Sequence, residues 1–407
     1  MNRQITKLHN IAAKPTRTII GLMSGTSLDG LDIAVCRVTG SGKDTDVKVL
    51  RFQTMVYDQN FRELILRVFA KTEILHPDIC GLNALIADRH ASMVNQALSN
   101  WGMRPENVDL IASHGQTVFH APVDSAQESG PYPNSTLQIG DGDHIAVRTG
   151  IITVSDFRQK HVAAGGEGAP LALYGDYLLF SDTAEDRILL NMGGIANFTY
   201  LPSRKSQQVG LQAFATDTGP ANTLMNQYVQ RHFGVEMDRD ALLAAQGQVN
   251  ERLLKALLDH SFFKLPLPKT TGPELFNMEF LQNAQKQSSS EGLDPHDVLA
   301  TLCAFSGSSI AGAIRNIVEK LPGDKPLGVY ASGGGFSNPL LMGHIKGKLG
   351  ESDLAIQSFG VLGIEPDAKE AVLFAVLANE TLAGNPEHVK SVQGAPAICM
   401  GKICFPV

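Results

Sequence analysis

The segment that begins at Gly21 combines glycine, hydroxyl and carboxylate groups in a pattern suited to binding phosphate. It reads Gly-Leu-Met-Ser-Gly-Thr-Ser-Leu-Asp-Gly-Leu-Asp and ends at Asp32. The segment lies between two predicted strands, so we expect a tight hairpin whose amides face a polyphosphate, with Gly25 allowing close approach. Asp29 and Asp32 could hold Mg²⁺, which prefers oxygen ligands. An ordinary hairpin with its turn at Asp29-Gly30 is an equally good interpretation of this segment alone.

A second candidate segment, Ala215 to Asn222, reads Ala-Thr-Asp-Thr-Gly-Pro-Ala-Asn and precedes a predicted helix. Helix N-termini attract anions, so phosphate binding fits this position. Asp217 stands before the turn, where a carboxylate can act as a general base toward water or a sugar hydroxyl. A structural cap for the turn is the competing interpretation of an isolated aspartate in such a place.

Histidine and arginine side chains offer polar contacts elsewhere in the chain. The run from His114 to His120 holds two histidines without a third nearby ligand, which makes a poor zinc site. We expect contacts to sugar hydroxyls from His114 and Gln116, or a turn histidine satisfied by the backbone. Arg158 follows a predicted strand and could grip a carboxylate or phosphate with two hydrogen bonds, or pair with the nearby Asp156.

Three other segments resemble functional motifs less well. Gly40-Ser-Gly-Lys-Asp44 lacks the earlier glycine and the hydroxyl residue of a phosphate-binding loop, so we expect a surface turn. Gly333-Gly-Gly-Phe-Ser-Asn338 lacks the last glycine of the dinucleotide-binding pattern. Acidic residues at the start of a predicted helix over 368–382 are ordinary partners of the helix dipole, and only Glu370 would be functional, if it faced a ligand.

The elements that must position these residues alternate between short β-branched runs and helical patterns, which is typical of an α/β protein. Helical spacing of apolar residues occurs at 61–69 and 298–305. The predicted strands are Thr18–Ile20, Ile33–Val38, Leu110–Ala112, Ile151–Val154, Ile188–Leu190 and Val329–Ala331.

An internal repeat indicates two related halves. The apolar run, glycine turn and second apolar run of 18–38 recur at 187–201, and the strand and glycine loop of 110–115 recur at 329–334. The length of 407 residues also exceeds what one hydrophobic core usually organises. We therefore expect two lobes, with residues 1–155 and 378–407 in domain I, residues 156–377 in domain II, and the ligands bound between them.

Composition narrows the class of protein. The chain has 34 Lys+Arg against 41 Asp+Glu, and the net charge of -7 argues against nucleic acid or an anionic membrane as a partner. The five cysteines form no C-x-x-C pair and indicate a reducing compartment. No continuous apolar run reaches membrane-spanning length. We expect a cytoplasmic enzyme whose first 17 residues are a short flexible tail.

Taken together, the motifs resemble the anhydro-N-acetylmuramic acid kinase family, a branch of the actin, Hsp70 and hexokinase-like fold. They span nearly the whole chain and are specific as a set. The matching stretches are GLMSGTSLDGLD from Gly21, SHGQTVFH from Ser113, QIGDGDHIA from Gln138, VSDFR from Val154, NMGGIAN from Asn191, DTGPAN from Asp217, TGPELFN from Thr271, SGGG from Ser332 and PDAKEA from Pro366.

This resemblance implies a two-lobed, duplicated ribonuclease H-like fold with central mixed sheets flanked by helices. It also implies a kinase that uses ATP and Mg²⁺ on a 1,6-anhydro sugar in peptidoglycan recycling, with Asp217 as the catalytic base and Asp29 as a metal ligand. ATP contacts are assigned to Ser24, Gly25, Thr26, Ser27, Leu28, Asp29, Gly30, Leu31, Asp32, Gly193, Gly194, Gly219, Gly333, Gly334, Gly335 and Asn338. Substrate contacts are assigned to His114, Gln116, Arg158, Asn197 and Glu370. A homodimer is left open.

The sequence departs from the usual family pattern at His161, Glu167, Ala221 and Pro273, and also in Leu171-Ala-Leu-Tyr174, which lacks the proline and following histidine common in the family. Several of them fall near the expected sugar side, so the choice of anhydro sugar stays open. Two other functions are therefore kept: a kinase of another anhydro sugar such as levoglucosan, and a non-catalytic, nucleotide-gated sugar sensor on the same fold.

Overall fold

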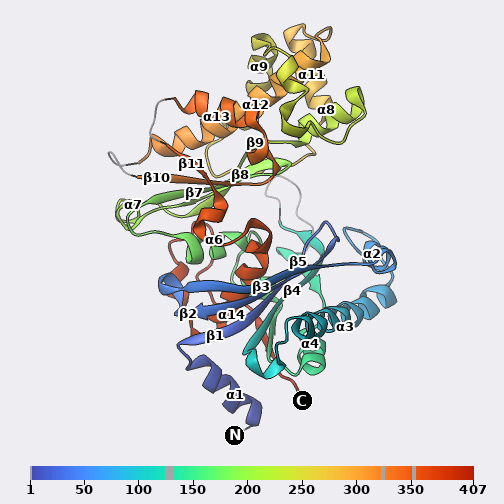
Figure 1. Cartoon of the computed structure of the whole chain (residues 1–407), viewed down its shortest axis with the longest axis vertical. Coiled ribbons are helices and arrows are strands. Elements are labelled where there is room, and N and C mark those ends of the chain that lie inside the picture. Colours follow the sequence, from blue (N-terminus) through green and yellow to red (C-terminus); the bar gives the residue numbers. More distant parts are fainter. Residues whose placement is uncertain (1, 124–131, 322–325, 351–353) are drawn as a thin grey trace. The chain divides into compact units, whose positions relative to one another are not determined.

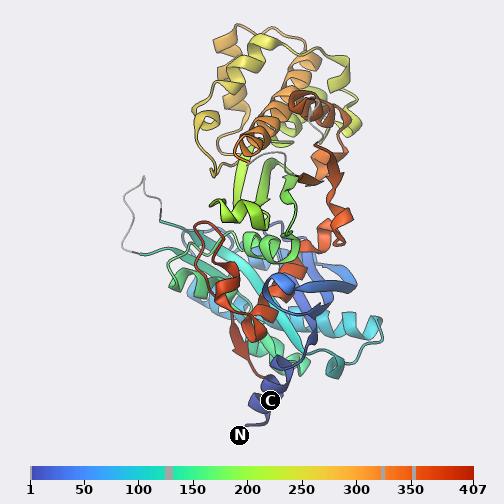
Figure 2. The same ribbon diagram turned by 90° about the vertical axis from the view of Figure 1, so that its left-hand side faces the viewer.

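A computed structural model describes residues 2–123, 132–321, 326–350 and 354–407. The chain divides into two compact units, each a sheet flanked by helices (Figures 1 and 2). Unit 1 comprises Met1–Phe180 and Asp367–Val407, and unit 2 comprises Ser181–Pro366. Both boundaries differ from the expected ones, because residues 156–180 and 367–377 belong to unit 1. The reason is that the helix over residues 369–383 packs on the first sheet and on the helix over residues 172–180.

Unit 1 is built on a mixed sheet with the order β12-β6-β4-β1-β2-β3, to which β5 adds beside β4. The first three strands are antiparallel neighbours, whereas β4 and β6 run parallel to β1. Apolar side chains fill both faces of β1 and β2, as expected for central strands. The strands are β1 (Thr16–Ser24), β2 (Gly30–Thr39), β3 (Asp46–Val56), β4 (Leu110–Ala121), β5 (Ser135–Ile139), β6 (Thr153–Ser155) and β12 (Lys402–Cys404).

Unit 2 repeats this topology with the order β11-β10-β7-β8-β9. Here too the first three strands in sequence are antiparallel neighbours, and the next two run parallel to the first. The two halves predicted from the internal repeat are therefore confirmed. The strands are β7 (Asp186–Met192), β8 (Ile195–Leu201), β9 (Phe214–Pro220), β10 (Leu327–Ser332) and β11 (Ile356–Ser358).

The helices cover these sheets and, in unit 2, add a helical layer beyond the sheet (Figure 1). Those of unit 1 are α1 (Arg3–Ala12), α2 (Gln59–Leu66), α3 (His76–Asn100), α4 (Gly142–Thr149), α5 (Phe157–Ala163), α6 (Ala172–Phe180) and α14 (Lys369–Ala383). Those of unit 2 are α7 (Arg204–Gln208), α8 (Thr223–Phe233), α9 (Glu251–Leu258), α10 (Ser261–Lys264), α11 (Met278–Ser288), α12 (Pro295–Val318) and α13 (Pro339–Leu349).

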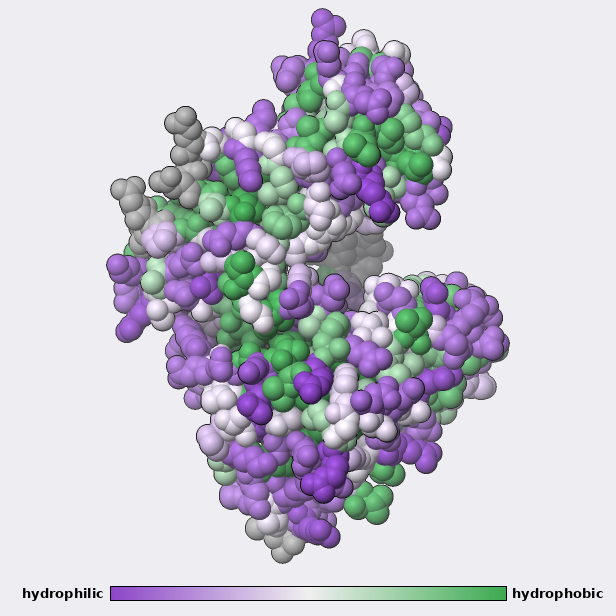
Figure 3. Space-filling model, viewed as in Figure 1, coloured by the Kyte–Doolittle hydropathy of each residue, from purple (hydrophilic) through white to green (hydrophobic). Residues whose placement is uncertain are grey.

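Helix α12 is long and apolar enough, among the described residues, to pass a length and composition test for a membrane span. However, 78% of its most apolar stretch is buried inside the protein. Its side chains belong to the hydrophobic core of unit 2. On the face shown in Figure 3, polar side chains cover much of both units and apolar side chains gather in separate patches. We therefore assign α12 as a core helix.

The N-terminal residues differ from the expected flexible tail. Residues 3–12 form helix α1, which Asn2 caps by accepting a hydrogen bond from the Gln4 amide. Arg17 is only 3% exposed and donates to the carbonyl oxygens of Ile11 and Ala12, and also to Oδ1 of Asn379 at 2.9 Å. The expectation of a flexible tail was wrong because this buried guanidinium ties the end of α1 to β1 and α14.

Helix α14 lies against β1 at a very short distance, and Gly21 makes this possible. A Cβ atom at position 21 would stand 1.8 Å from the carbonyl oxygen of Ala371. No side chain fits in that space, so the backbone of the helix and that of the strand are in direct contact. The contact holds α14, more than 300 residues further along the chain, on the first sheet.

We predict that Gly21→Ala lowers the free energy of unfolding by ~1–3 kcal/mol, because the methyl group must push α14 away from β1. The matched control is Gly81→Ala. Gly81 lies inside α3, and a methyl group at this position would meet no neighbouring atom within 4 Å. Alanine there should stabilise the helix by up to ~1 kcal/mol. Thermal melts of both variants test this, and equal melting temperatures would contradict the close packing of α14.

Candidate active site

The glycine-rich hairpin connects β1 to β2, as its sequence predicts. Ser24 ends β1 and Gly30 begins β2, so residues 25–29 form the loop. Leu28 adopts a left-handed backbone conformation with φ 57°, which is uncommon for a branched side chain. Its side chain is 3% exposed and belongs to the core of unit 1. Burial of Leu28 thus anchors the middle of the loop and offsets the backbone strain.

The residues assigned to ATP in this hairpin divide by exposure. Thr26, Ser27 and Asp29 are exposed, and Ser27 donates to Oδ1 of Asp29 at 2.7 Å. The side chains of Ser24, Leu28 and Leu31 are buried. A phosphate at this loop would therefore meet its backbone and the three exposed side chains.

Asp29 stands close enough to Asp32 to influence the pKa of the Asp32 carboxyl. Burial raises the pKa of Asp32, a hydrogen bond from Thr54 opposes that shift, and the charges of Asp29 and Asp367 add to the increase. Within the described residues, no group of three His, Cys, Asp or Glu side chains is placed to hold a metal ion. A Mg²⁺ ion at these two carboxylates would need phosphate oxygens and water to complete its coordination, which is how Mg²⁺ is usually bound.

Gln116 lies on β4 beside the end of β1 and is turned toward the hairpin. Its Nε2 donates to the carbonyl oxygens of Gly25 at 3.3 Å and Thr117 at 3.2 Å, and its Oε1 accepts from Ser24. The side chain is fully buried. Gln116 was assigned to the sugar, but in this structure its polar atoms hold the hairpin.

His114 and Arg158 form a buried pair in unit 1. Arg158 Nε donates to His114 Nε2 at 3.0 Å, so His114 must carry its proton on Nδ1, which donates to the Gly115 carbonyl at 2.9 Å. Burial, with a smaller contribution from the charge of Arg158, lowers the pKa of His114 to about 3. The imidazole is therefore neutral, and its main role in this structure is to orient Arg158.

Glu370 lies in the first turn of α14 and is an electrostatic neighbour of Arg158. The side chain is accessible to solvent, yet the protein around it desolvates the carboxylate and raises its pKa. Lys369 and Arg158 oppose this shift, whereas Asp32 adds to it. Glu370 therefore lies within electrostatic range of Arg158 and of Asp32, which follows the hairpin in β2.

In unit 2 two glycine turns lie side by side. Gly333, at the end of β10, has φ 84°, and a Cβ atom there would stand 2.7 Å from the backbone of Met192. Asn222 Nδ2 donates to the carbonyl oxygens of Met192 at 3.2 Å and Gly193 at 2.8 Å. The turn at Gly193-Gly194 and the loop Gly333–Gly335 thus form one continuous backbone surface.

The start of α8 is less available to an anion than the sequence suggested. The amides of Ala221, Asn222 and Thr223 donate to the carbonyl oxygens of Gly194 and Gly193 at 2.9–3.1 Å. Three amides that could have met a phosphate are thus already occupied by the hairpin between β7 and β8.

Two further residues assigned to ATP have structural roles in unit 2. Gly219 has φ 137°, a conformation open to glycine, and a Cβ atom there would meet the ring of Phe263 at 3.0 Å. Asn338 caps α13, because its Oδ1 accepts from the Leu341 amide at 2.9 Å.

Asp217 lies on β9 and is held by the loop that precedes α11. Its amide donates to the Lys269 carbonyl at 2.9 Å, and its Oδ2 accepts from the Thr271 amide at 2.8 Å. Oδ1 has no hydrogen-bond partner among the described residues. Asn197 is the partner of Asp217 across the β8–β9 ladder, next to a bulge, so their side chains are neighbours.

Burial raises the pKa of Asp217, the Thr271 amide opposes the shift, and the negative charge of Glu274 adds to it. A desolvated carboxylate with one free oxygen and a raised pKa is a stronger base than an exposed one. This arrangement suits the abstraction of a proton from water or a hydroxyl group.

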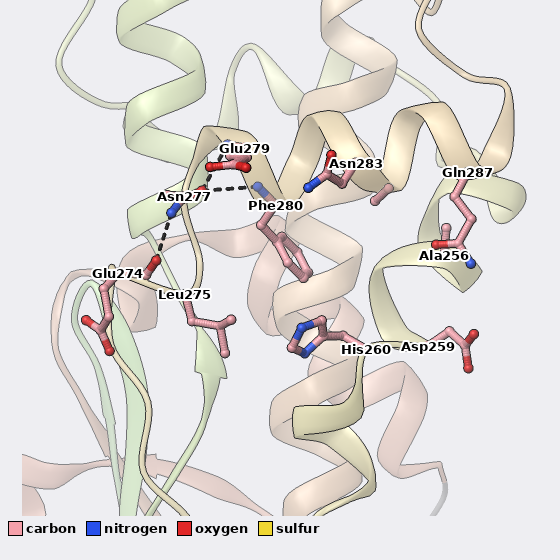
Figure 4. A pocket seen from close by; sticks show the side chains of 11 residues that line it. Ala256, Asp259, His260, Glu274, Leu275, Asn277, Glu279, Phe280, Asn283 and Gln287 are labelled. Atoms are coloured by element: carbon pink, nitrogen blue, oxygen red, sulfur yellow. Dashed lines mark hydrogen bonds between the residues drawn. The ribbon is translucent and has the colours of Figure 1, made fainter. Parts of the chain in front are cut away.

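A pocket of about 410 Å³ lies in the helical layer of unit 2, beside the loop that holds Asp217. Figure 4 shows the rings of Phe280 and His260 facing this pocket and Asn277 capping α11. The centroids of the two rings are 5.5 Å apart. Glu274 lines one side. A second pocket of about 490 Å³ lies in unit 1 near Gly115 and Lys402.

The atypical His161 holds a glycine-rich loop. Its side chain is 3% exposed, and Nδ1 accepts a hydrogen bond from the Gly168 amide at 2.9 Å. The ring fills the space above Gly166, where a Cβ atom would clash. Arg158 donates to the carbonyl of the same Gly168, so this loop also helps to position Arg158.

Sequence reasoning missed Tyr57 and His90, which are buried near the hairpin, and the backbone of Lys269 and Thr271, which holds Asp217. No motif marks the first pair, since Tyr57 directly follows β3 and His90 lies within the long helix α3. Thr271 begins the stretch TGPELFN, which resembles the family motif. However, its contact with Asp217 is made by the backbone amide, and such a contact cannot be read from the types of side chain in the sequence.

The sequence matches the family model described as anhydro-N-acetylmuramic acid kinase over residues 17–406. It is 52% identical over 408 residues to an anhydro-N-acetylmuramic acid kinase of Pseudoalteromonas atlantica, with 100% of both chains covered. It is 39% identical over 400 residues to one of Caldanaerobacter subterraneus subsp. tengcongensis, with 98% of this chain and 99% of the relative covered. A solved hexokinase from Schistosoma mansoni complexed with glucose aligns with a TM-score of 0.36 and 11% identity over 90% of this chain and 86% of that one. On the two sequence matches and the family model, the chain belongs to the anhydro-N-acetylmuramic acid kinase family.

Proposed function

We propose that the protein uses water to open the 1,6-anhydro bridge of 1,6-anhydro-N-acetylmuramic acid and transfers the γ-phosphoryl group of ATP to O6. The products are N-acetylmuramic acid 6-phosphate and ADP. Family membership supports the substrate and the kinase activity. The observation that supports the chemistry most directly is Asp217, whose Oδ2 is fixed by the Thr271 amide while Oδ1 remains available to a water molecule.

In this reaction Asp217 accepts a proton from water as the water oxygen bonds to C1. The bond between C1 and O6 breaks, and O6 takes the γ-phosphoryl group while ADP leaves. No carboxylic acid is needed to protonate the leaving oxygen, because the phosphoryl group accepts it. One well-placed base is therefore enough, and the rest of the site must position the reactants and neutralise charge.

The other assigned residues would position the reactants and neutralise charge. The hairpin and the glycine turns of unit 2 would hold ATP, and Asp29 and Asp32 would hold Mg²⁺, which neutralises phosphate charge when bound. Arg158 has guanidinium N–H groups beyond those that bind His114 and Gly168, and these suit the lactyl carboxylate of the sugar. Asn197 and Glu370 would contact sugar hydroxyls. A homodimer and a cytoplasmic location stay predictions.

We predict that Asp217→Asn lowers kcat by about 10²–10⁴-fold, because an amide cannot accept the proton of the attacking water. In H₂¹⁸O the wild-type enzyme should place the label on C1 of the phosphosugar, as read by mass spectrometry. A control with preformed N-acetylmuramic acid 6-phosphate in labelled water measures exchange at C1. Label on phosphate instead of sugar would contradict the attack of water at C1. Full activity in Asp217→Asn would contradict the assignment of Asp217 as the base.

The raised pKa of Asp217 predicts a pH effect. The base must be deprotonated, so kcat/KM rises with pH through its pKa. Glu274→Gln removes a negative charge that raises this pKa, so the acidic limb of the profile should move to lower pH. Glu279→Gln is the matched control, since Glu279 lines the same pocket but does not contribute to the shift. An unchanged limb in Glu274→Gln would show that another group titrates there.

We predict that Arg158→Ala lowers kcat/KM for the anhydro sugar that bears the lactyl carboxylate by about 10–100-fold, the value of a charge-assisted hydrogen bond. Turnover of levoglucosan, which lacks that carboxylate, should change much less. Lys160→Ala is the control, because Lys160 is exposed on the same helix. Equal losses on both sugars would mean that Arg158 supports the fold of the site and not the carboxylate.

A further inference from the structure

A chain of buried hydrogen bonds runs from the core of unit 1 to the start of the hairpin. His90 Nε2 and the Tyr57 hydroxyl are 2.8 Å apart, and the Tyr57 hydroxyl lies 2.7 Å from Ser24 Oγ. Ser24 in turn contacts Oε1 of Gln116. All four side chains are at most 3% exposed. His90 lies on α3, Tyr57 directly follows β3, Ser24 ends β1 and Gln116 lies on β4. These hydrogen bonds therefore connect four parts of unit 1.

The donor and acceptor in each of these hydrogen bonds can be assigned by starting from Gln116. Gln116 Nε2 donates to two backbone carbonyl groups, so the amide oxygen must face Ser24 and accept. Ser24 gives its single proton to that oxygen and must accept from Tyr57. Tyr57 in turn must accept from His90, which therefore carries its proton on Nε2. Burial lowers the pKa of His90 to about 3, so the ring stays neutral and this order does not change at neutral pH.

This order has a consequence for Ser24. Its only proton is committed to Gln116, and its side chain is 2% exposed. Ser24 therefore cannot donate to a phosphate oxygen while the chain is intact. The ATP contact expected of Ser24 holds at most for its backbone.

Tyr57 also reaches the opposite end of the loop. Its amide donates to the carbonyl oxygen of Asp29 at 3.0 Å, while its hydroxyl donates to Ser24. Gln116 holds Gly25, the residue after Ser24. One tyrosine thus contacts both the first and the last part of the hairpin, and Gln116 fixes the glycine between them.

We infer that Tyr57 and His90 are positioning residues that fix the hairpin 25–29 in the conformation that binds the phosphates of ATP. Buried polar side chains are costly where apolar ones would pack as well, and His90 Nδ1 has no partner among the described residues. We expect a series of buried hydrogen bonds with such a desolvation cost where it fixes the conformation of a nearby segment. The inference rests on the proposed use of ATP and adds two residues that touch neither ATP nor sugar.

The first test is Tyr57→Phe, which removes one hydroxyl group and keeps the ring and the amide bond to Asp29. We expect the KM for ATP to rise about tenfold, because the buried N–H group of His90 then has no partner. The KM for the sugar should be unchanged. Direct titration with a non-hydrolysable ATP analogue, without sugar, should show the same loss of affinity. A melting curve reports how much of the fold is affected.

The second test uses His90. Glutamine can place an N–H group near the position of Nε2, whereas leucine has similar bulk and no donor. We expect His90→Gln to keep an ATP affinity near that of wild type and His90→Leu to lose about as much as Tyr57→Phe. The double variant Tyr57→Phe/His90→Leu should lose no more than either single change, because both act through Ser24.

The outcomes separate this inference from the proposed function. Wild-type turnover of ATP and the anhydro sugar tests the reaction independently of these variants. If wild type is active and the variants change only the melting temperature, or raise the KM of both substrates equally, the positioning role is overturned and the reaction stands. Additive losses in the double variant would also overturn it, because two residues that act through the same series of hydrogen bonds cannot act independently.

Discussion

The contact between α14 and β1 at Gly21 is the constraint on which unit 1 depends. The backbone of the strand touches the carbonyl oxygen of Ala371, and only a residue without a side chain leaves room for it. This contact places Glu370 at the start of α14 near Arg158, and it places Phe374 against the ring of His114, with 4.8 Å between ring centroids. The contact therefore helps to bring the last part of the chain to the candidate site.

The two units share one topology but stabilise their glycine turns by different means. In unit 1 buried side chains of Tyr57 and Gln116 hold the hairpin from the core side. In unit 2 the turns hold each other, since Gly333 approaches the backbone of Met192 and Asn222 bridges two carbonyl groups. The same strand order can therefore carry a polar loop in one half and a backbone surface in the other. The proposed base, Asp217, lies on a third kind of position, a strand residue fixed by a loop amide.

The unusual residues of this chain bear on the choice of sugar less than their positions in the motifs suggest. His161 faces inward and accepts from the Gly168 amide, and Ala221 is fully buried in the core of unit 2. Both side chains serve the packing of their own loops. Pro273 and Glu167 are exposed, so they remain the two atypical positions that a ligand could meet.

Much of the fold followed from periodicity and from the repeat, because apolar alternation and glycine turns are local signals. They predicted the six strands named from the sequence, the two related halves and the location of the hairpin between β1 and β2. Local signals do not define which distant segments pack together. The boundaries at Phe180 and Asp367, and the helix formed by residues 3–12, depend on α14 and on the buried Arg17 and so were not predicted correctly.

The sequence by itself determined the residue types of the candidate site and the family to which the chain belongs. Only the tertiary structure decided how their hydrogen-bonding groups are used. It turned Gln116 toward the hairpin and Ser24 toward Gln116 and Tyr57, engaged both nitrogens of His114 and left one oxygen of Asp217 available. The physical reason is that a hydroxyl has one proton and an amide has a fixed donor side, so their partners in space determine their function. The hairpin that begins this site is recognisable from its letters, but its shape is determined by Tyr57 and His90, which the motif does not contain.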